Sequence, residues 1–351
     1  MNVPNFLPLA LGLVLFSFLI TSLLIVPYIN LLYKLKLTRK KEAPPSGKIP
    51  LFDKLHDVKA GTPLGGGILI IAVVSLLFAL LFPFASRTGV YIRSSYNFKS
   101  ELLVIFFTFL SFGFLGLYDD LIKIFVKPTK GTVGLWFGLN RKQKFILQWI
   151  LGFIVGYILY HNLGIDLLHI PLIDKTFHMG VWFVPFSAFV IVSFTNAFNI
   201  TDGLDGLAVG LLIICLAAFG AIAATTLDTP LSLFIALLFG SLISFMYFNV
   251  WPARIFLGDA GALSFGATLA IIGLLTGSIV ALVVIGGLFV LEMASSLIQI
   301  IGWRYFNKPV LPLAPLHNTF LAKGWEEPKI VMRALLTGFV LAIFGLWMAT
   351  I

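Results

Sequence analysis

The sequence predicts an all-α integral membrane protein with about ten transmembrane helices, forming a single polytopic domain over residues 1–351. Hydrophobic residues make up 59% of the 351 residues, charged residues make up 11%, and the mean hydropathy is +1.03. Apolar runs long enough to cross a bilayer recur along the chain, and such runs are typical of membrane-spanning helices. Domain counts based on the length of soluble proteins therefore do not apply.

Ten segments fit this description, and their ends are marked by prolines such as Pro230, Pro252 and Pro309. The first segment has neither a basic leader nor a small-residue cleavage site, so we expect a retained span and not a signal peptide. The single cysteine, Cys215, excludes a disulfide framework and a cysteine metal site. The expected spans are 6–33, 65–85, 101–118, 144–162, 181–198, 204–225, 230–250, 262–280, 282–303 and 332–351.

The basic residues predict the topology. With ten spans both termini lie on one side, and the loops 34–64, 119–143, 199–203, 251–261 and 304–331 share the other side. Those loops and their flanks hold all but four of the 24 Lys and Arg residues, the exceptions being Arg87, Arg93, Lys99 and Lys175. Because Lys and Arg concentrate in cytoplasmic loops, we expect periplasmic termini. The net charge of +9 then reflects topology, and no nucleic-acid partner is expected.

Five carboxylates sort to the same cytoplasmic edge of the membrane. Asp119 and Asp120 close the third expected span, Asp202 and Asp205 open the sixth, and Asp259 precedes the eighth. Acids that only solvate loops have no reason to sort in this way. We therefore expect these acids, far apart in the chain, to converge in one pocket at the membrane surface.

The most polar stretch is N-A-F-N-I-T-D-G-L-D-G-L at 196–207. Asn196 and Asn199 are three residues apart, as are Asp202 and Asp205, and residues three apart share one face of a helix. Polar groups are costly next to membrane spans, which favours a functional site. The alternative is an ordinary polar turn between two helices.

Asp119 and Asp120 stand at the C-terminal end of a span, where the helix dipole disfavours negative charge. Lys123, one turn further on, is a sufficient structural counter-charge, and a divalent cation is the functional alternative. Asp259 lies in the short G-D-A-G turn before a span. Mg²⁺ keeps several waters and takes substrate phosphate oxygens, so it suits a site with few protein ligands.

Three further residues stand out. Lys59 precedes the glycine-rich turn A-G-T-P-L-G-G-G, which fits either phosphate binding or a plain entry turn. His317 lies in the last loop, where it suits proton transfer or phosphate contact. Glu292 is expected deep in the ninth span, as a functional acid or an interhelical hydrogen-bond partner, whereas Glu326 and Glu327 read as ordinary loop residues.

In combination these motifs resemble the polyprenyl-phosphate N-acetylhexosamine-1-phosphate transferase superfamily over nearly the whole chain. Within it, the chain is most similar to the branch of phospho-N-acetylmuramoyl-pentapeptide transferases. The motifs occur in the family's order: K-A-G-T-P-L-G-G-G at 59–67, Asp119–Asp120, the stretch at 196–208, F-N-V-W-P-A at 248–253, L-G-D-A-G at 257–261, and A-P-L-H followed by K-G-W-E-E-P-K at 323–329.

The resemblance implies transfer of phospho-MurNAc-pentapeptide from its UDP carrier to undecaprenyl phosphate, giving lipid I and UMP with Mg²⁺. It implies a homodimer in the bacterial cytoplasmic membrane with its active site facing the cytoplasm. It makes Asp259 the Mg²⁺ ligand, places Asp119 and Asp120 at the lipid phosphate, and gives His317 a catalytic position. The implied substrate-binding residues are Lys59, Lys144, Asn196, Asn199, Asp202, Asp205 and Asn249.

Two other functions fit parts of the pattern. A sibling enzyme of the superfamily transfers GlcNAc-1-phosphate to the same lipid. An ion-coupled transporter could use the acids as a relay, but transport sites lie near the bilayer midplane, and these acids are expected at one edge. The chain also differs from the family's pattern, since Asn318 and Thr319 follow His317 where the family has further histidines.

Overall fold

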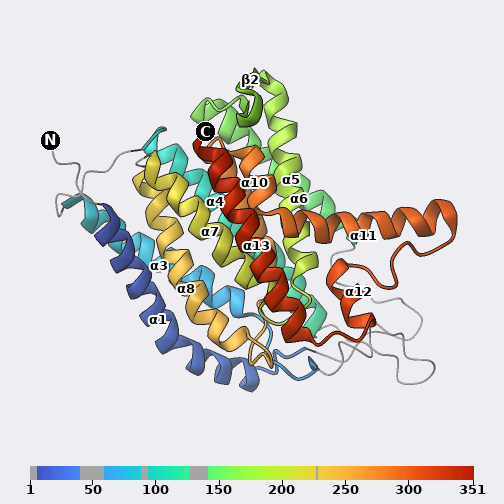
Figure 1. Cartoon of the computed structure of the whole chain (residues 1–351). Coiled ribbons are helices and arrows are strands. Elements are labelled where there is room, and N and C mark those ends of the chain that lie inside the picture. The colour runs from blue at the N-terminus through green and yellow to red at the C-terminus, as the bar shows by residue number, and fades with distance from the viewer. Residues whose placement is uncertain (1–5, 40–58, 88–93, 126–140, 227) are drawn as a thin grey trace.

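The computed structural model describes residues 6–39, 59–87, 94–125, 141–226 and 228–351 (Figure 1). The expected basic loops 34–64 and 119–143 lie partly outside these residues. The elements are α1 (Phe6–Lys34), α3 (Gly66–Arg87), α4 (Phe98–Phe125), α5 (Arg141–Leu163), β1 (Leu167–Ile170), β2 (Lys175–His178), α6 (Phe183–Thr201), α7 (Leu207–Thr225), α8 (Thr229–Asn249), α9 (Gly258–Leu275), α10 (Ile279–Ile285), α11 (Gly287–Phe306), α12 (Leu316–Ala322) and α13 (Glu327–Thr350).

The predicted helical membrane architecture is confirmed. Among the described residues, nine helices are long and apolar enough to cross a membrane, and the bent pair α10–α11 makes ten if it is counted as one span. The last turn of α1 and the first turn of α13 both lie at the lower end of the bundle in Figure 1. The chain therefore enters and leaves the bundle with its first and last helices running in opposite directions.

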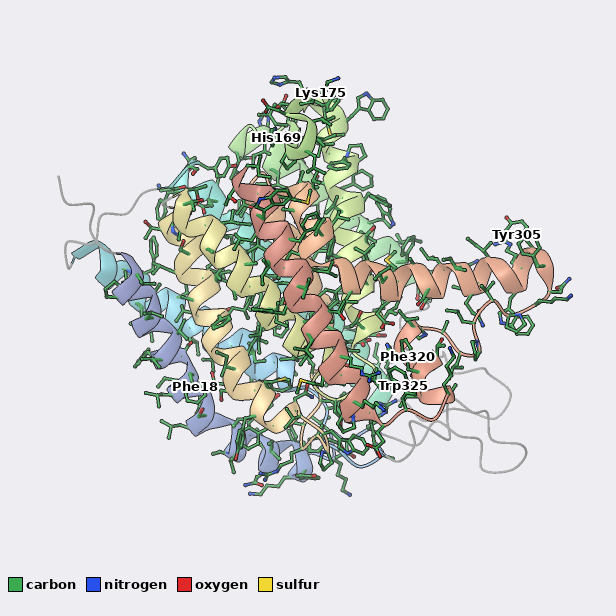
Figure 2. All side chains as sticks on the ribbon, in the orientation of Figure 1. Phe18, His169, Lys175, Tyr305, Phe320 and Trp325 are labelled. Carbon is green, nitrogen blue, oxygen red and sulfur yellow. The ribbon has the colours of Figure 1, made fainter. Side chains whose placement is uncertain are left out.

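The expected continuous span 282–303 is wrong. Residues 279–306 form two helices, α10 and α11, that meet at an angle of 76° around Gly286. In Figure 1 α11 projects sideways from the bundle, and in Figure 2 Tyr305 lies at its outer end. Hydropathy could not reveal the bend, because both arms are apolar.

Two small elements were also not expected. β1 and β2 form an antiparallel hairpin that pairs Leu167 with His178 and Ile170 with Lys175. It follows α5 at the end of the bundle opposite the carboxylates, where Figure 2 labels His169 and Lys175. The last loop contains the short helix α12, whose Phe320 packs on Trp325 with ring centroids 4.8 Å apart.

The core is organised around α9, whose residues are nearly all buried between α3, α4, α6 and α7. Its sequence is rich in Gly, Ala and Ser, and small residues let membrane helices approach closely. The tightest approach is to α4, where a Cβ on Gly116 would lie 2.1 Å from the carbonyl oxygen of Asp259. This contact brings the end of α4 against the first turn of α9, where three of the five predicted acids lie.

Candidate active site

Two carboxylates and two lysines form the centre of the site. The Lys144 Nζ atom lies 2.9 Å from Asp119 Oδ2 and 2.6 Å from Asp259 Oδ2. The Lys123 Nζ atom also lies 2.9 Å from Asp119 Oδ2 and 2.6 Å from Asp259 Oδ2. α4 supplies Asp119 and Lys123, α5 supplies Lys144, and α9 supplies Asp259. Three helices therefore bring four charges to one point, as the sorting of the acids predicts.

The two lysines differ in how much they contribute. The Lys123 side chain is 56% exposed, and exposed ion pairs contribute on the order of 1 kcal/mol or less. The Lys144 side chain is only 17% exposed, so its charge is less screened by water. Lys123, predicted as a sufficient structural counter-charge of Asp119, thus shares this role with the less exposed Lys144.

Asp120 holds the first turn of α9. Its two carboxylate oxygens accept hydrogen bonds from the backbone N–H of Asp259 at 3.1 Å and of Ala260 at 3.0 Å. These N–H groups have no partner within the helix, and the helix dipole favours a negative charge there. Asp120 therefore fixes the backbone that carries Asp259, while Asn199 of α6 donates from Nδ2 to Asp259 Oδ1 at 3.0 Å.

Asp202 and Asp205 lie in the turn between α6 and α7, so the prediction that they share a helix face is wrong. Asp202 is the C-terminal cap of α6, and Gly206 has the positive φ of 79° that ends the turn. Burial, followed by the negative charge of Asp259, raises the pKa of the Asp202 carboxyl to about 8. The charges of Lys59 and Arg39 oppose that increase.

A second buried ion cluster supports this turn. The Lys59 Nζ atom lies 2.6 Å from Asp205 Oδ1 and 2.5 Å from Glu327 Oε1. The same Glu327 oxygen accepts the backbone N–H of Asp205 at 2.6 Å. Asn249 Oδ1 accepts the backbone N–H of Gly206 at 3.1 Å. The cluster joins the segment before α3, the α6–α7 turn, the end of α8 and the start of α13.

Glu327 was missed in the sequence, and reading it as an ordinary loop residue is wrong. It is the first residue of α13 and is buried, whereas its neighbour Glu326 is exposed. An acid in the first turn of a helix looks unremarkable, because such acids usually interact with the helix dipole. The signal in the sequence was the family motif K-G-W-E-E-P-K at 323–329, which contains Glu327.

The two remaining predicted residues have different partners. Asn196 donates from Nδ2 to Gln148 Oε1 at 2.7 Å and to the Val192 carbonyl at 2.8 Å, so it ties α6 to α5. His317 of α12 is buried beside the α6–α7 turn, and a Cβ on Gly203 would lie 2.5 Å from its Nε2. The structure thus brings His317 to the turn of Asp202 and Asp205, and places Asn196 at a helix interface.

The oxygens present at the centre fit Mg²⁺. Among the described residues, no three His, Cys, Asp or Glu side chains are grouped so as to hold a metal by themselves. Mg²⁺ needs only one or two carboxylates together with water and substrate phosphates. Asp119 and Asp259 supply two such carboxylate oxygens, and both face the same ammonium groups, so their surroundings already accommodate positive charge.

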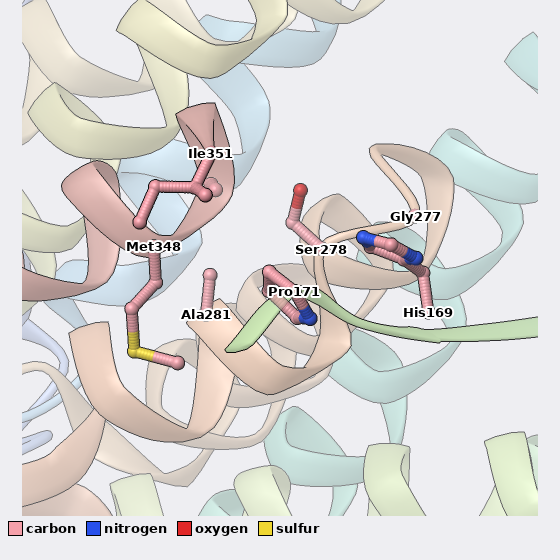
Figure 3. A pocket seen from close by; sticks show the side chains of 8 residues that line it. His169, Pro171, Gly277, Ser278, Ala281, Met348 and Ile351 are labelled. Atoms are coloured by element: carbon pink, nitrogen blue, oxygen red, sulfur yellow. The ribbon is translucent and has the colours of Figure 1, made fainter. Parts of the chain in front are cut away.

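A small cavity lies at the other end of the bundle and takes no part in this arrangement. Figure 3 shows its lining, which includes His169 and Pro171 of the hairpin segment, Gly277 and Ser278 before α10, and Met348 of α13. His169 is its single titratable residue. The convergence of acids, amides and lysines at the opposite end therefore defines the candidate active site.

Comparison with known proteins agrees with this arrangement. Residues 102–277 match the family description Glycosyl transferase family 4. The chain is 32% identical to the phospho-N-acetylmuramoyl-pentapeptide-transferase of Clostridium beijerinckii over 96% of this chain and 94% of that protein. It is 32% identical to the Bacillus subtilis enzyme of the same name, over 95% and 96% of the two chains. A Clostridium perfringens enzyme of that name is 33% identical over 90% of each chain. The chain therefore belongs to glycosyl transferase family 4 and, within it, to the phospho-N-acetylmuramoyl-pentapeptide-transferases.

Proposed function

We propose that this protein transfers phospho-MurNAc-pentapeptide from UDP-MurNAc-pentapeptide to undecaprenyl phosphate, forming lipid I and UMP. This is the first membrane step of peptidoglycan synthesis. The names of the relatives support the reaction. The main structural support for this reaction is the convergence of two carboxylates and two lysines at one point, namely Asp119, Asp259, Lys123 and Lys144. Phosphoryl transfer depends mainly on positioning and on neutralising charge, and this cluster offers both.

We assign the Mg²⁺ position to Asp259, with Asp119 beside it and Asn199 orienting the Asp259 carboxylate. A bound Mg²⁺ ion supplies charge neutralisation for the pyrophosphate of the nucleotide-sugar. Lys144 and Lys123 add positive charge at the same oxygens, where two anionic substrates have to approach each other. Asp120 acts indirectly, by holding the backbone N–H groups of Asp259 and Ala260.

We assign the nucleotide-sugar to the α6–α7 turn. Lys59, Asp205 and Asn249 hold that turn in place, Asp202 is part of it, and His317 lies against it at Gly203. Asn196, although it matches a family position, supports this site from the α5–α6 interface. The acceptor lipid then approaches the Asp119 side of the cluster, along the exposed apolar surfaces of the outer helices.

Direct attack by the lipid phosphate on the sugar-linked phosphorus is the simplest chemistry for this arrangement. The second pKa of a phosphate monoester is about 6, so the acceptor is largely dianionic at neutral pH and needs no strong base. Asp119 then orients the acceptor. A two-step route through an aspartyl phosphate is the alternative. Isolation of a phosphorylated enzyme after incubation with UDP-sugar and no lipid would overturn the direct route.

The experiment that tests the function measures UMP release by the purified protein with undecaprenyl phosphate. UDP-MurNAc-pentapeptide and UDP-GlcNAc are compared, each with and without Mg²⁺. We expect UMP only with the muramoyl substrate and only with Mg²⁺. Turnover of UDP-GlcNAc instead would support the sibling enzyme, and substrate uptake into liposomes without UMP release would support the transporter.

The cellular setting follows from the same proposal. The active-site end of the bundle faces the cytoplasm, and both termini lie on the periplasmic side of the bacterial inner membrane. The excess of Lys and Arg at the active-site end supports this orientation. A homodimer is part of the proposal, in line with the family, and cross-linking in native membranes tests it.

A further inference from the structure

Glu292 has a partner that the sequence could not identify. Its Oε2 atom lies 3.0 Å from Nδ1 of His317, and the backbone N–H of His317 donates to its two oxygens at 3.2 and 3.3 Å. Both residues are buried. The bend between α10 and α11 makes this contact possible, because it turns α11 toward α12.

The contact fixes which ring nitrogen faces the candidate active site. With Nδ1 directed at the Glu292 carboxylate, Nε2 points to the α6–α7 turn, within 2.5 Å of where a Cβ on Gly203 would lie. Among the described residues, no hydrogen bond uses Nε2. Gly203 lies next to Asp202, and its carbonyl is 3.4 Å from Nζ of Lys59. A ring nitrogen is thus presented at the turn that we assign to the nucleotide-sugar.

We propose that Glu292 is a positioning residue for the transferase reaction, which holds His317 so that its Nε2 meets a polar group of the bound nucleotide-sugar. This inference rests on the proposed function, because that function places the substrate at the α6–α7 turn. A carboxylate that accepts Nδ1–H selects the tautomer and the orientation of an imidazole. The carboxylate also binds the His317 backbone N–H, so the ring and its main chain are fixed together.

The charges around the ring are consistent with this role. Glu292 is in direct contact with His317 from α11. Lys59 is the nearby cation, and its charge is already matched by Asp205 and Glu327. The carboxylate in contact therefore dominates the surroundings of the ring.

The test compares Glu292→Leu, Glu292→Gln, His317→Ala and the double variant Glu292→Leu/His317→Ala in the UMP-release assay. Glu292→Leu removes the hydrogen bonds at similar volume, and a displaced catalytic group costs on the order of 100-fold. We expect kcat/KM for UDP-MurNAc-pentapeptide to fall about 100-fold, with the KM for undecaprenyl phosphate unchanged. Glu292→Gln keeps an acceptor oxygen for Nδ1–H, so it should restore most of the activity.

The double variant decides whether Glu292 acts through His317. If it does, the double variant is no slower than His317→Ala alone, because groups that act as a unit are not additive. Additive losses, or Glu292→Leu turnover equal to that of the parent protein, overturn the inference. If Glu292→Leu does not fold, Glu292→Gln still tests the inference. Low activity in a correctly folded Glu292→Gln variant would overturn the positioning role of Glu292.

Ser295 provides the matched control. Its Oγ donates to the Glu292 carbonyl at 2.7 Å and accepts the Leu316 N–H at 2.9 Å, so it joins α11 to α12 without touching His317. Ser295→Ala should lower thermal stability slightly and leave kcat/KM unchanged. Equal activity losses in Ser295→Ala and Glu292→Leu would show that only helix docking matters. Absence of UMP release by the parent protein would refute the proposed function itself, and with it the role of the Glu292–His317 pair.

Discussion

Replacing Glu327 by Ala should destabilise the protein and at the same time impair the proposed nucleotide-sugar site. Glu327 Oε1 accepts from the Lys59 ammonium at 2.5 Å and from the Asp205 N–H at 2.6 Å. Hydrogen bonds that involve charged groups contribute about 1.5–3 kcal/mol each. Lys59 keeps Asp205 as a partner, so the loss should be below the full cost of an unpaired buried charge, which is about 3–5 kcal/mol. We expect about 3 kcal/mol.

This loss has two readouts in detergent-purified protein. The entropy of unfolding is about 2.1 cal/mol/K per residue, which for 351 residues converts 3 kcal/mol into a fall in melting temperature of about 4 °C. Because Lys59 and Asp205 hold the α6–α7 turn, which is the proposed nucleotide-sugar site, kcat/KM for UDP-MurNAc-pentapeptide should fall at least about 30-fold, the kinetic equivalent of about 2 kcal/mol. Glu327→Gln keeps an acceptor oxygen but loses the charge. Its melting temperature and kcat/KM should therefore lie between those of the parent protein and of Glu327→Ala.

Glu326→Ala is the matched control, because Glu326 is the exposed neighbour of Glu327 at the same helix start. It removes the same side chain from the same helix end without touching Lys59. The reasoning is refuted if Glu327→Ala and Glu326→Ala have the same melting temperature and the same kcat/KM.

Three further outcomes follow from the structure. Asp259→Asn should abolish UMP release while the protein remains folded and inserted, and the exposed Asp174→Asn should be fully active; turnover by Asp259→Asn would exclude its metal role. Gly116→Ala should cost about 1–3 kcal/mol of stability by forcing α4 off α9, whereas Gly12→Ala, which meets nothing within 4 Å, should be neutral in the same thermal assay. The pKa of Asp202 is raised to about 8, so the folded protein favours the protonated carboxyl. The stability that this bound proton contributes is lost as the pH rises through 8. Asp202→Asn should therefore melt above the parent protein in Mg²⁺-free buffer, with a margin that grows from pH 6 to pH 9.

Hydropathy was sufficient to predict most of the fold. Apolar runs predicted the membrane helices, because burial in lipid demands long apolar segments regardless of the partner helices. The bend near Gly286 was not predictable, since apolar residues continue on both sides and no proline marks it. The hairpin of β1 and β2 was also missed, because four-residue strands carry too little alternation to stand out.

The convergence of the candidate-site residues was predictable from the sequence, and their individual contacts were less so. Sorting the acids to one edge identified Asp119, Asp202 and Asp259, because unpaired charge at a membrane surface is costly. The pairs Lys59–Glu327 and Glu292–His317 were not predictable, since each depends on how the last helices return to the bundle. Asp119 and Asp120 are adjacent in the sequence, and only the packing of α4 on α9 gives the two acids different contacts.

The ion pair between Lys59 and Glu327 joins positions 268 residues apart. During synthesis the last helix emerges from the ribosome long after the first loop has been made. Lys59 therefore gains Glu327 as its second counter-ion only when translation is almost finished. A chain arrested before Glu327 is made lacks the contact that completes the ion cluster at the α6–α7 turn. We therefore expect catalytic competence to depend on completion of the polypeptide as far as Glu327.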